Sequence, residues 1–221
     1  RAQYRVSELV ANGYLAAGFV LNAGTLLQFL QAGALQEAWN LQKQGYGDGS
    51  LGLNLARARV MAETAQLRSF GFNVTAGTQG FENAKMHLKA LQLEAQGFGN
   101  GTISGLMGAE RAYQEATLRA QGFLAAGPTT YLQFLIAQNM QRYAQLASVG
   151  LIAWGGGVPT INLANLSAFL QAGIRLQTLQ LRAEGYTGTL NQMRLQQQRD
   201  QLIAHGYITT RRETNSQIYQ N

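Results

Sequence analysis

The feature that most constrains the fold of this sequence is a dipeptide of glycine followed by a hydrophobic residue, which recurs at helix-like intervals. The first four copies lie 26, 26 and 25 residues apart, and each follows a stretch of helix-favouring residues. Glycine just after a helix adopts the left-handed conformation at little cost, and a hydrophobic residue after it packs back on the last turn. The dipeptides therefore predict helix ends at Gly45-Tyr46, Gly71-Phe72, Gly97-Phe98, Gly122-Phe123, Gly150-Leu151, Gly185-Tyr186 and Gly206-Tyr207.

Between these dipeptides, Leu, Ala and Met recur at spacings of three and four, which is the period of an amphipathic helix. No sustained alternation of Val, Ile or Thr indicates a strand. The sequence therefore predicts an all-α fold. Short connections favour antiparallel neighbours, so we expect elongated helical hairpins or a bundle, in an oligomer. The predicted helices span residues 24–44, 52–70, 77–96, 102–121, 129–149, 160–184 and 188–205, with a short additional helix over 3–12.

A longer repeat lies on top of the helix pattern. The pentapeptide Phe-Leu-Gln-Ala-Gly at 29–33 recurs at 169–173, and each copy reaches Gly-Tyr after the same interval. The pattern predicts three related units, each with a glycine-containing loop, a Phe-Leu helix and a glycine-hydrophobic end, which begin near Gly13, Gly122 and Gly150. No clear boundary divides the chain. We expect a single elongated helical domain over 1–207 and a polar C-terminal tail over 208–221.

The composition argues against an enzyme. Charged residues make up 13% of the chain, Cys is absent, and there are 2 His. This excludes a thiolate metal site and a Cys nucleophile. His87 and His205 have no partner pattern for a metal, and we expect neither a metal nor a cofactor. An enzyme remains as a third hypothesis, which would require carboxylates such as Glu110 and Glu184 to converge in a pocket.

The glycine-rich segment Gly47–Gly52 matches the dinucleotide-binding fingerprint G-x-G-x-x-G. That fingerprint needs a strand before it, so that a tight turn can aim a helix N-terminus at the pyrophosphate. Here the preceding residues favour a helix, and a second glycine-rich connector follows one unit later. The segment is therefore interpreted as a loop between helices.

The net charge of the chain is +6 and its sequence pI is about 9.8. A basic chain favours anionic partners. The excess is diffuse, with tight pairs only at Arg57/Arg59 and Arg211/Arg212. We therefore expect non-specific proximity to DNA rather than a nucleic-acid site.

Three stretches, 9–36, 120–141 and 143–174, lack any Asp, Glu, Lys or Arg. They are long enough to span a bilayer, but they contain several Asn and Gln residues. Two interpretations stay open: buried packing faces of a soluble assembly, or conditional insertion into a membrane. The loop at Trp154, which continues Gly-Gly-Gly, either contacts a membrane interface or a neighbouring subunit, or folds back on its own helices.

The region from Leu146 to Met193 resembles a known family. It reads Leu-Ala-Ser-Val-Gly-Leu, then a glycine-rich turn that ends at Pro159, then a long helix that ends Leu-Arg-Ala-Glu-Gly-Tyr at Tyr186. This order resembles the pattern of internal virion proteins from short-tailed bacteriophages, which are ejected ahead of the genome and help to form a conduit across the host envelope. The acidic residues common in the family's long helix are largely missing here. The family has no catalytic residues to transfer at these positions.

The resemblance implies a non-enzymatic virion structural or ejection protein that oligomerises into a ring or tube. Its expected location is the virion and, after ejection, the host cell envelope. Its implied partners are further copies of the chain, portal or tail components, and a membrane. A helical subunit of a bacterial secretion system or envelope channel is the alternative. For oligomer or membrane contact we expect Phe29, Leu30, Gly33, Phe134, Leu135, Trp154, Phe169, Leu170 and Gly173.

Overall fold

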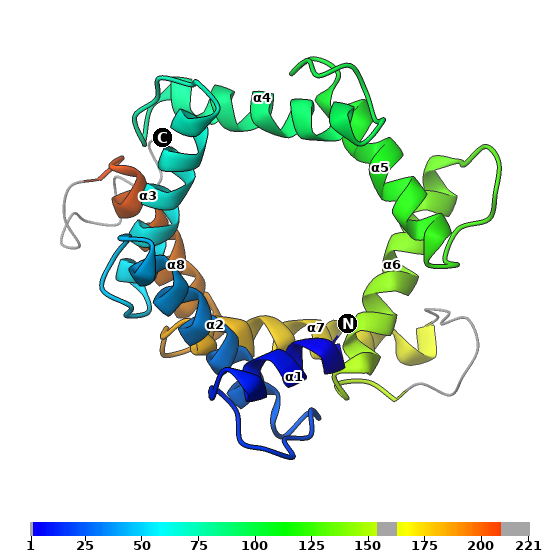
Figure 1. Cartoon of the computed structure of the whole chain (residues 1–221). Coiled ribbons are helices and arrows are strands. Elements are labelled where there is room, and N and C mark those ends of the chain that lie inside the picture. The colour runs from blue at the N-terminus through cyan, green and yellow to red at the C-terminus, as the bar shows by residue number, and fades with distance from the viewer. Residues whose placement is uncertain (1, 154–162, 209–221) are drawn as a thin grey trace. The chain divides into compact units, whose positions relative to one another are not determined.

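The computed structural model describes residues 2–153 and 163–208, and within these ranges the chain forms eight helices and no strand (Figure 1). The all-α prediction is therefore confirmed. Each predicted helix has a counterpart, and the largest displacement is at the start of α5, predicted at 102 and found at Leu106. The helices are α1 (Ala2–Ala11), α2 (Leu26–Lys43), α3 (Leu53–Ser69), α4 (Gln79–Ala95), α5 (Leu106–Ala120), α6 (Tyr131–Ser148), α7 (Leu163–Ala183) and α8 (Leu190–His205).

The chain divides into two compact units, Arg1–Phe81 with Ile174–Asn221, and Glu82–Gly173. Each unit is described by itself. The expectation of a single domain over 1–207 stays a prediction, and residues 209–221 of the expected tail lie outside the described residues.

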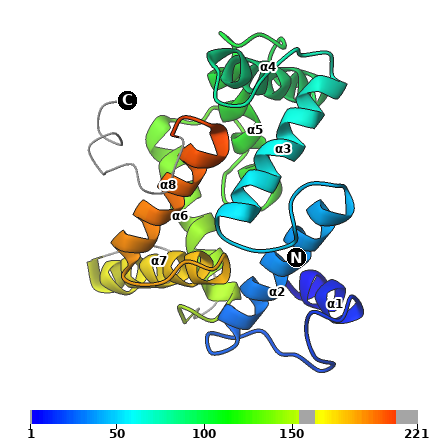
Figure 2. The same cartoon turned by 90° about the vertical axis from the view of Figure 1, so that its left-hand side faces the viewer.

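In the first unit, α3 and α8 lie against each other, α2 packs on α3, and α1 packs on α2 (Figure 2). Its core is built from leucines on the inner faces of these helices. Leu9, Leu26, Leu55 and Leu67 are almost completely buried. Burial of each such side chain contributes about 1.5–3 kcal/mol, so these contacts hold the four helices together.

In the second unit, α5 packs on α6. One apolar cluster joins the end of α5 to α6 and contains Leu118, Phe134 and Ala137. A second cluster joins α4 to α5 around Leu93 and Leu106. The unit is therefore held by small, local clusters.

All helix ends within the described residues share one backbone geometry. At the end of α1, the N–H of Tyr14 donates to the carbonyl of Leu9 at 2.9 Å, and the N–H of Gly13 donates to the carbonyl of Val10 at 3.0 Å. This pair of bonds is the Schellman motif, which needs a left-handed residue, and the eight glycines have φ between 74° and 95°. The pattern Leu-x3-Gly-hydrophobic produces this geometry. Its leucines are Leu9, Leu41, Leu67, Leu93, Leu118, Leu146, Leu181 and Leu202.

Seven of the described helices extend this pattern toward their N-termini. In α2, α4, α6 and α7 it reads Phe-x2-Ala-x8-Leu-x3-Gly-hydrophobic. In α3, α5 and α8 a Leu replaces the Phe, and in α8 Met193 also replaces the Ala. The residue three positions after the first Phe or Leu is buried in all seven helices. The shared pattern makes these helices copies of one structural unit. The buried residues are Ala32, Ala58, Ala84, Ala109, Ala137, Ala172 and Met193.

Candidate functional site

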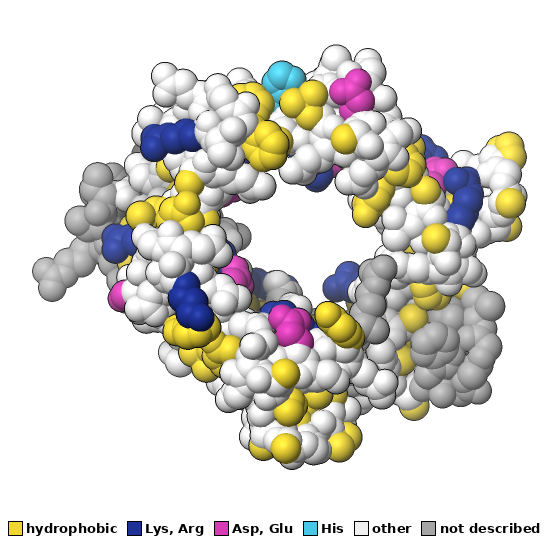
Figure 3. Space-filling model, viewed as in Figure 1, with side chains coloured by type: hydrophobic (Ala, Val, Ile, Leu, Met, Phe, Trp, Pro, Cys, Tyr) yellow, Lys and Arg dark blue, Asp and Glu magenta, His cyan; other side chains and the backbone are white. Residues whose placement is uncertain are grey.

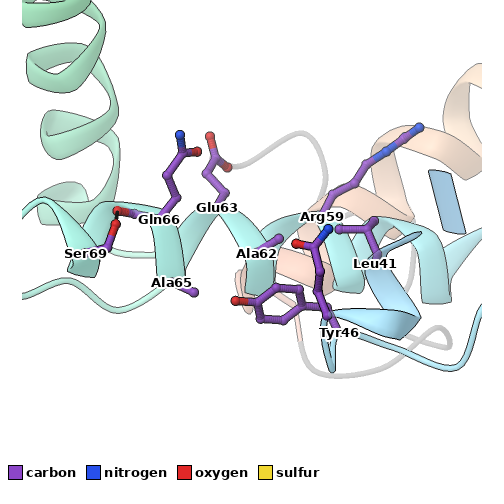
Figure 4. Close-up of a pocket in the computed structure, with 9 residues that line it drawn as sticks. Leu41, Tyr46, Arg59, Ala62, Glu63, Ala65, Gln66 and Ser69 are labelled. Carbon is purple, nitrogen blue, oxygen red and sulfur yellow. Dashed lines mark hydrogen bonds between the residues drawn. The ribbon is translucent and has the colours of Figure 1, made fainter. Parts of the chain in front are cut away.

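A concavity of the first unit lies between α2 and α3. It has a volume of about 740 Å³ and is lined by residues from the end of α2, the following loop and one face of α3. Figure 4 shows the ring of Tyr46 beside Ala62, with Leu41 and Arg59 at one end of the groove and Ser69 at the other. We call this concavity the α2–α3 groove. Its lining residues are Leu41, Gln44, Tyr46, Arg59, Ala62, Glu63, Ala65, Gln66 and Ser69.

An ion cluster closes the Arg59 end of the groove. The Nε and Nη2 atoms of Arg59 donate to the two carboxylate oxygens of Glu37, each at 2.7 Å. Both Nη atoms of Arg59 also lie 3.0 Å from Oε1 of Glu184. The side-chain amide of Gln197 donates to the other oxygen of Glu184 at 3.0 Å. A bidentate arginine pair is directional, so the cluster fixes α2, α3, α8 and the end of α7 relative to one another.

Both partners of the central pair remain ionised at neutral pH. The hydrogen bonds from Arg59 hold the pKa of Glu37 below its usual range. The hydrogen bonds to Glu37 raise the pKa of Arg59 further. Neither group therefore exchanges protons near neutral pH, and the cluster supplies fixed charges rather than a general acid or base.

A smaller cavity of about 290 Å³ lies on the other side of this cluster, between α1, α2 and the end of α7. Three predicted contact residues, Phe29, Leu30 and Gly33, line it together with Leu9 and Arg5. These residues are half-buried, or fully buried in the case of Leu9. The structure thus brings these three predicted residues together at a cavity of the first unit.

The other predicted contact residues have diverse surroundings. Phe134 is buried against Leu118, and the Phe169 ring stacks on Tyr143 with 6.1 Å between ring centroids. Leu135 and Gly173 are half-buried, and Trp154 lies outside the described residues. Leu170 is the most exposed of the predicted set that the structure describes, at 54%. A contact role for these residues stays a prediction.

Exposed apolar side chains follow α6 and α7 at helical spacing. Leu132 and Ile136 lie on one face of α6. Leu166, Leu170 and Ile174 lie four residues apart along α7, so they form a stripe. Figure 3 shows hydrophobic side chains exposed over the helices. Large exposed apolar faces on helices mark sites of contact with other molecules.

The two carboxylates considered for catalysis, Glu110 and Glu184, each form an ion pair within its own unit. Glu184 pairs with Arg59 in the first unit, and Glu110 pairs with Lys89 in the second. Among residues 2–153 and 163–208, no group of three or more His, Asp or Glu side chains is placed to hold a metal ion. The segment Gly47–Gly52 lies in the connection between α2 and α3, so a helix precedes it, as predicted.

Comparison of the chain with protein-family models, curated proteins and solved structures finds no match. In the described part of the chain, no helix combines the length and the hydropathy that crossing a membrane requires.

Sequence analysis missed the ion cluster and the α2–α3 groove. Arg59 and Glu37 are 22 positions apart, and Arg59 and Glu184 are 125 positions apart. Spacing within one helix carries no signal for such pairs. The only sequence sign of the groove is Ala62. At the equivalent position of the shared helix pattern, five residues before the leucine of the helix end, α5 has Tyr113.

Proposed function

We propose that this chain is a virion structural protein, ejected with the genome in the manner of the internal proteins of short-tailed phages, and that it acts as a homo-oligomer. Copies associate through helix faces into a ring or tube that helps to form a conduit for DNA across the host envelope. The helices, arranged as elongated hairpins with glycine-hydrophobic ends, bury their apolar flanks in sister copies. The role needs no catalytic group.

The stripe on α7 is the observation that carries this proposal. Leu170 and Ile174 are 54% and 53% exposed, on a helix whose opposite face is buried at Ala172. Full burial of such a side chain contributes about 1.5–3 kcal/mol, and roughly half of this is forfeited here because each side chain is about half exposed. A second copy that covers the stripe recovers this free energy, which supports a function in assembly.

The charge of the chain supports passage of DNA nearby. The net charge is +6, while charged residues make up only 13% of the chain. A diffuse positive charge attracts phosphates without reading sequence. A wall built from such subunits attracts DNA weakly, and the DNA can move along it.

The self-association is tested by sedimentation velocity over a range of protein concentrations. The wild-type chain is expected to form discrete larger species. Leu170→Glu combined with Ile174→Glu is expected to shift the chain toward monomer, because charges on the stripe must then be desolvated. Gln171→Glu, an exposed polar position between them, is the matched control and is expected to leave association unchanged. A wild-type chain that stays monomeric throughout would refute the homo-oligomer.

The virion assignment is tested separately, by mass spectrometry of particles produced from the genome that encodes the chain. We expect the chain in purified particles and its loss from them after DNA ejection. Absence from particles, together with recovery alongside a secretion apparatus, would replace the proposal with the alternative of a secretion-system subunit.

A further inference from the structure

The hairpin α4–α5 in the second unit is a structural copy of the hairpin α2–α3 in the first. Leu41 of α2 corresponds to Leu93 of α4, and each is followed by the same Schellman helix end. Likewise, Leu67 of α3 corresponds to Leu118 of α5. Even a side-chain contact recurs: Nε of Arg68 donates to the carbonyl of Val74 at 3.2 Å, and Nε of Arg119 donates to that of Ala125 at 3.2 Å.

The ion pair between the two helices recurs with its charges reversed. In α2–α3 it joins Glu37 to Arg59. In α4–α5 it joins Lys89 to Glu110. Glu37 and Lys89 each lie four residues before the leucine of the helix end, and Arg59 and Glu110 each follow the buried alanine of the pattern. The two grooves are therefore equivalent in position and can be compared residue by residue.

The two grooves differ in what fills them. In α4–α5, the ring of Tyr113 packs edge-on against Phe98, with 5.4 Å between ring centroids and an interplanar angle of 84°. In α2–α3, the corresponding residues are Ala62 and Tyr46. The space left in the α4–α5 groove is about 270 Å³, against about 740 Å³ in the α2–α3 groove. The α2–α3 groove thus has the aromatic floor at Tyr46 but lacks the ring that covers it.

We propose that the α2–α3 groove receives an aromatic side chain from a second copy of this chain, in the place that Tyr113 occupies in α4–α5. The floor at Tyr46 and the flat surface of Ala62 and Ala65 suit a ring packed edge-on. The amides of Gln44 and Gln66 line the groove and can bond a phenol hydroxyl. The inference rests on the proposed homo-oligomer and adds a second interface to that of the α7 stripe.

Tyr131, at the start of α6, is the side chain that we assign to the groove. It is 64% exposed and is the first residue of the helix. The Arg111 guanidinium lies 5.9 Å from the centre of its ring. Tyr131 is therefore an exposed aromatic side chain at the start of a helix, which we call the knob, and aromatic side chains are frequent anchors of protein interfaces.

A knob and a groove at different places on one chain form a heterologous interface. Such an interface uses a different surface on each partner, so copies add head to tail and close into a ring or continue as a filament. This geometry matches the ring or tube of the proposed function. It also predicts that either surface can be blocked independently of the other.

The first test fills the groove from within. Ala62→Tyr places in α3 the residue that α5 already carries at the equivalent position, and it is expected to weaken self-association by at least about tenfold in Kd. Tyr131→Ala removes the knob and is expected to weaken it by a similar factor. Tyr4→Ala removes the most exposed tyrosine of the described residues, at 78%, and is the matched control. Circular dichroism checks that each variant is folded; Tyr131 is a surface residue, so its result stands even if Ala62→Tyr unfolds.

The second test mixes the two variants, each also carrying Leu170→Glu and Ile174→Glu so that the α7 stripe does not contribute. The Ala62→Tyr chain keeps its knob and the Tyr131→Ala chain keeps its groove, so the mixture is expected to form 1:1 pairs that do not grow further. Sedimentation velocity and native mass spectrometry report the stoichiometry.

Several outcomes would overturn the proposed interface. If wild type assembles and both variants assemble equally well, the interface is elsewhere while the proposed function stands. If the variants change stability but not association, the ring inserts within its own chain and the assignment to a second copy is wrong. If wild type itself never assembles, the proposed function fails.

Discussion

Gly47 approaches Ala58 so closely that a Cβ atom built on the glycine would lie 2.9 Å from the Cβ of Ala58. The relationship recurs in the second unit, where a Cβ on Gly99 would lie 2.7 Å from that of Ala109. In both hairpins, therefore, the loop after the first helix rests on a buried alanine of the second. The smallest residues on each side allow this contact.

Gly47→Ala is expected to destabilise the first unit by more than backbone strain alone. Gly47 has φ of 74°, and an L-residue there costs about 1–2 kcal/mol. The crowding against Ala58 adds about 1–3 kcal/mol. Gly13→Ala is the matched control, because Gly13 has φ of 76° and nothing within 4 Å of the added Cβ. Urea denaturation measures the free energy of unfolding of both variants. Equal losses would show that the loop relaxes away from Ala58.

Exchanging the two charged residues of an ion pair is expected to change the free energy of unfolding differently for the two pairs. Glu110 pairs with Lys89 alone among the described residues, so Lys89→Glu with Glu110→Lys is expected to change the free energy of unfolding by less than about 0.5 kcal/mol. The same exchange, Glu37→Arg with Arg59→Glu, is expected to cost roughly 1 kcal/mol after allowance for solvent screening, because the new carboxylate faces Glu184. Chemical denaturation of both double variants tests this, and a neutral exchange at 37 and 59 would contradict it.

The Glu37–Arg59 pair is expected to contribute to the pH dependence of stability. The folded-state pKa of Glu37 is lowered by its hydrogen bonds with Arg59. Its contribution is therefore present above the unfolded-state pKa and is lost as pH falls through the folded-state pKa. Stability of wild type should fall more steeply with acid than that of Glu37→Gln, between about pH 6 and about pH 3. Parallel curves of stability against pH for the two proteins would show that Glu37 has the same pKa in the folded and the unfolded state.

The leucine of each helix end is expected to carry stability rather than function. Leu67 is 1% exposed, so Leu67→Ala is expected to cost about 2–5 kcal/mol through lost burial and the cavity left behind. Leu35 on α2 is exposed, and Leu35→Ala is expected to cost less than about 0.5 kcal/mol. Thermal and urea denaturation compare the two. Similar costs would mean that α3 repacks around the missing side chain.

The helices could be predicted because their signals are local. A leucine and, four residues later, a glycine before a hydrophobic residue define an end, and the preceding period of three and four defines the helix. The start of α5 was placed too early because the residues Thr102-Ile-Ser before Gly105 favour no single state. Errors of this size concern the caps, where propensities are weak.

The surroundings of each helix could not be predicted in the same way. Phe29 and Phe169 begin identical pentapeptides, yet Phe29 lines a cavity beside Leu9 and Phe169 stacks on Tyr143. The difference comes from the neighbouring helix, which the pentapeptide does not encode. The α2–α3 groove was missed for a related reason. The groove is open because residue 62 is a small alanine. This becomes evident only when α2–α3 is compared with α4–α5, where Tyr113 fills the equivalent place.

The reversed ion pairs also bear on how a chain of near-identical helices sorts its own partners. By pattern, α2 could pack on α5 as well as on α3, and α4 on α3 as well as on α5. The first exchange would set Glu37 opposite Glu110, and the second would set Lys89 opposite Arg59. Both incorrect pairings bring like charges together. The opposite order of charges in the two ion pairs therefore disfavours swapped hairpins, both during folding and between neighbouring copies of the chain.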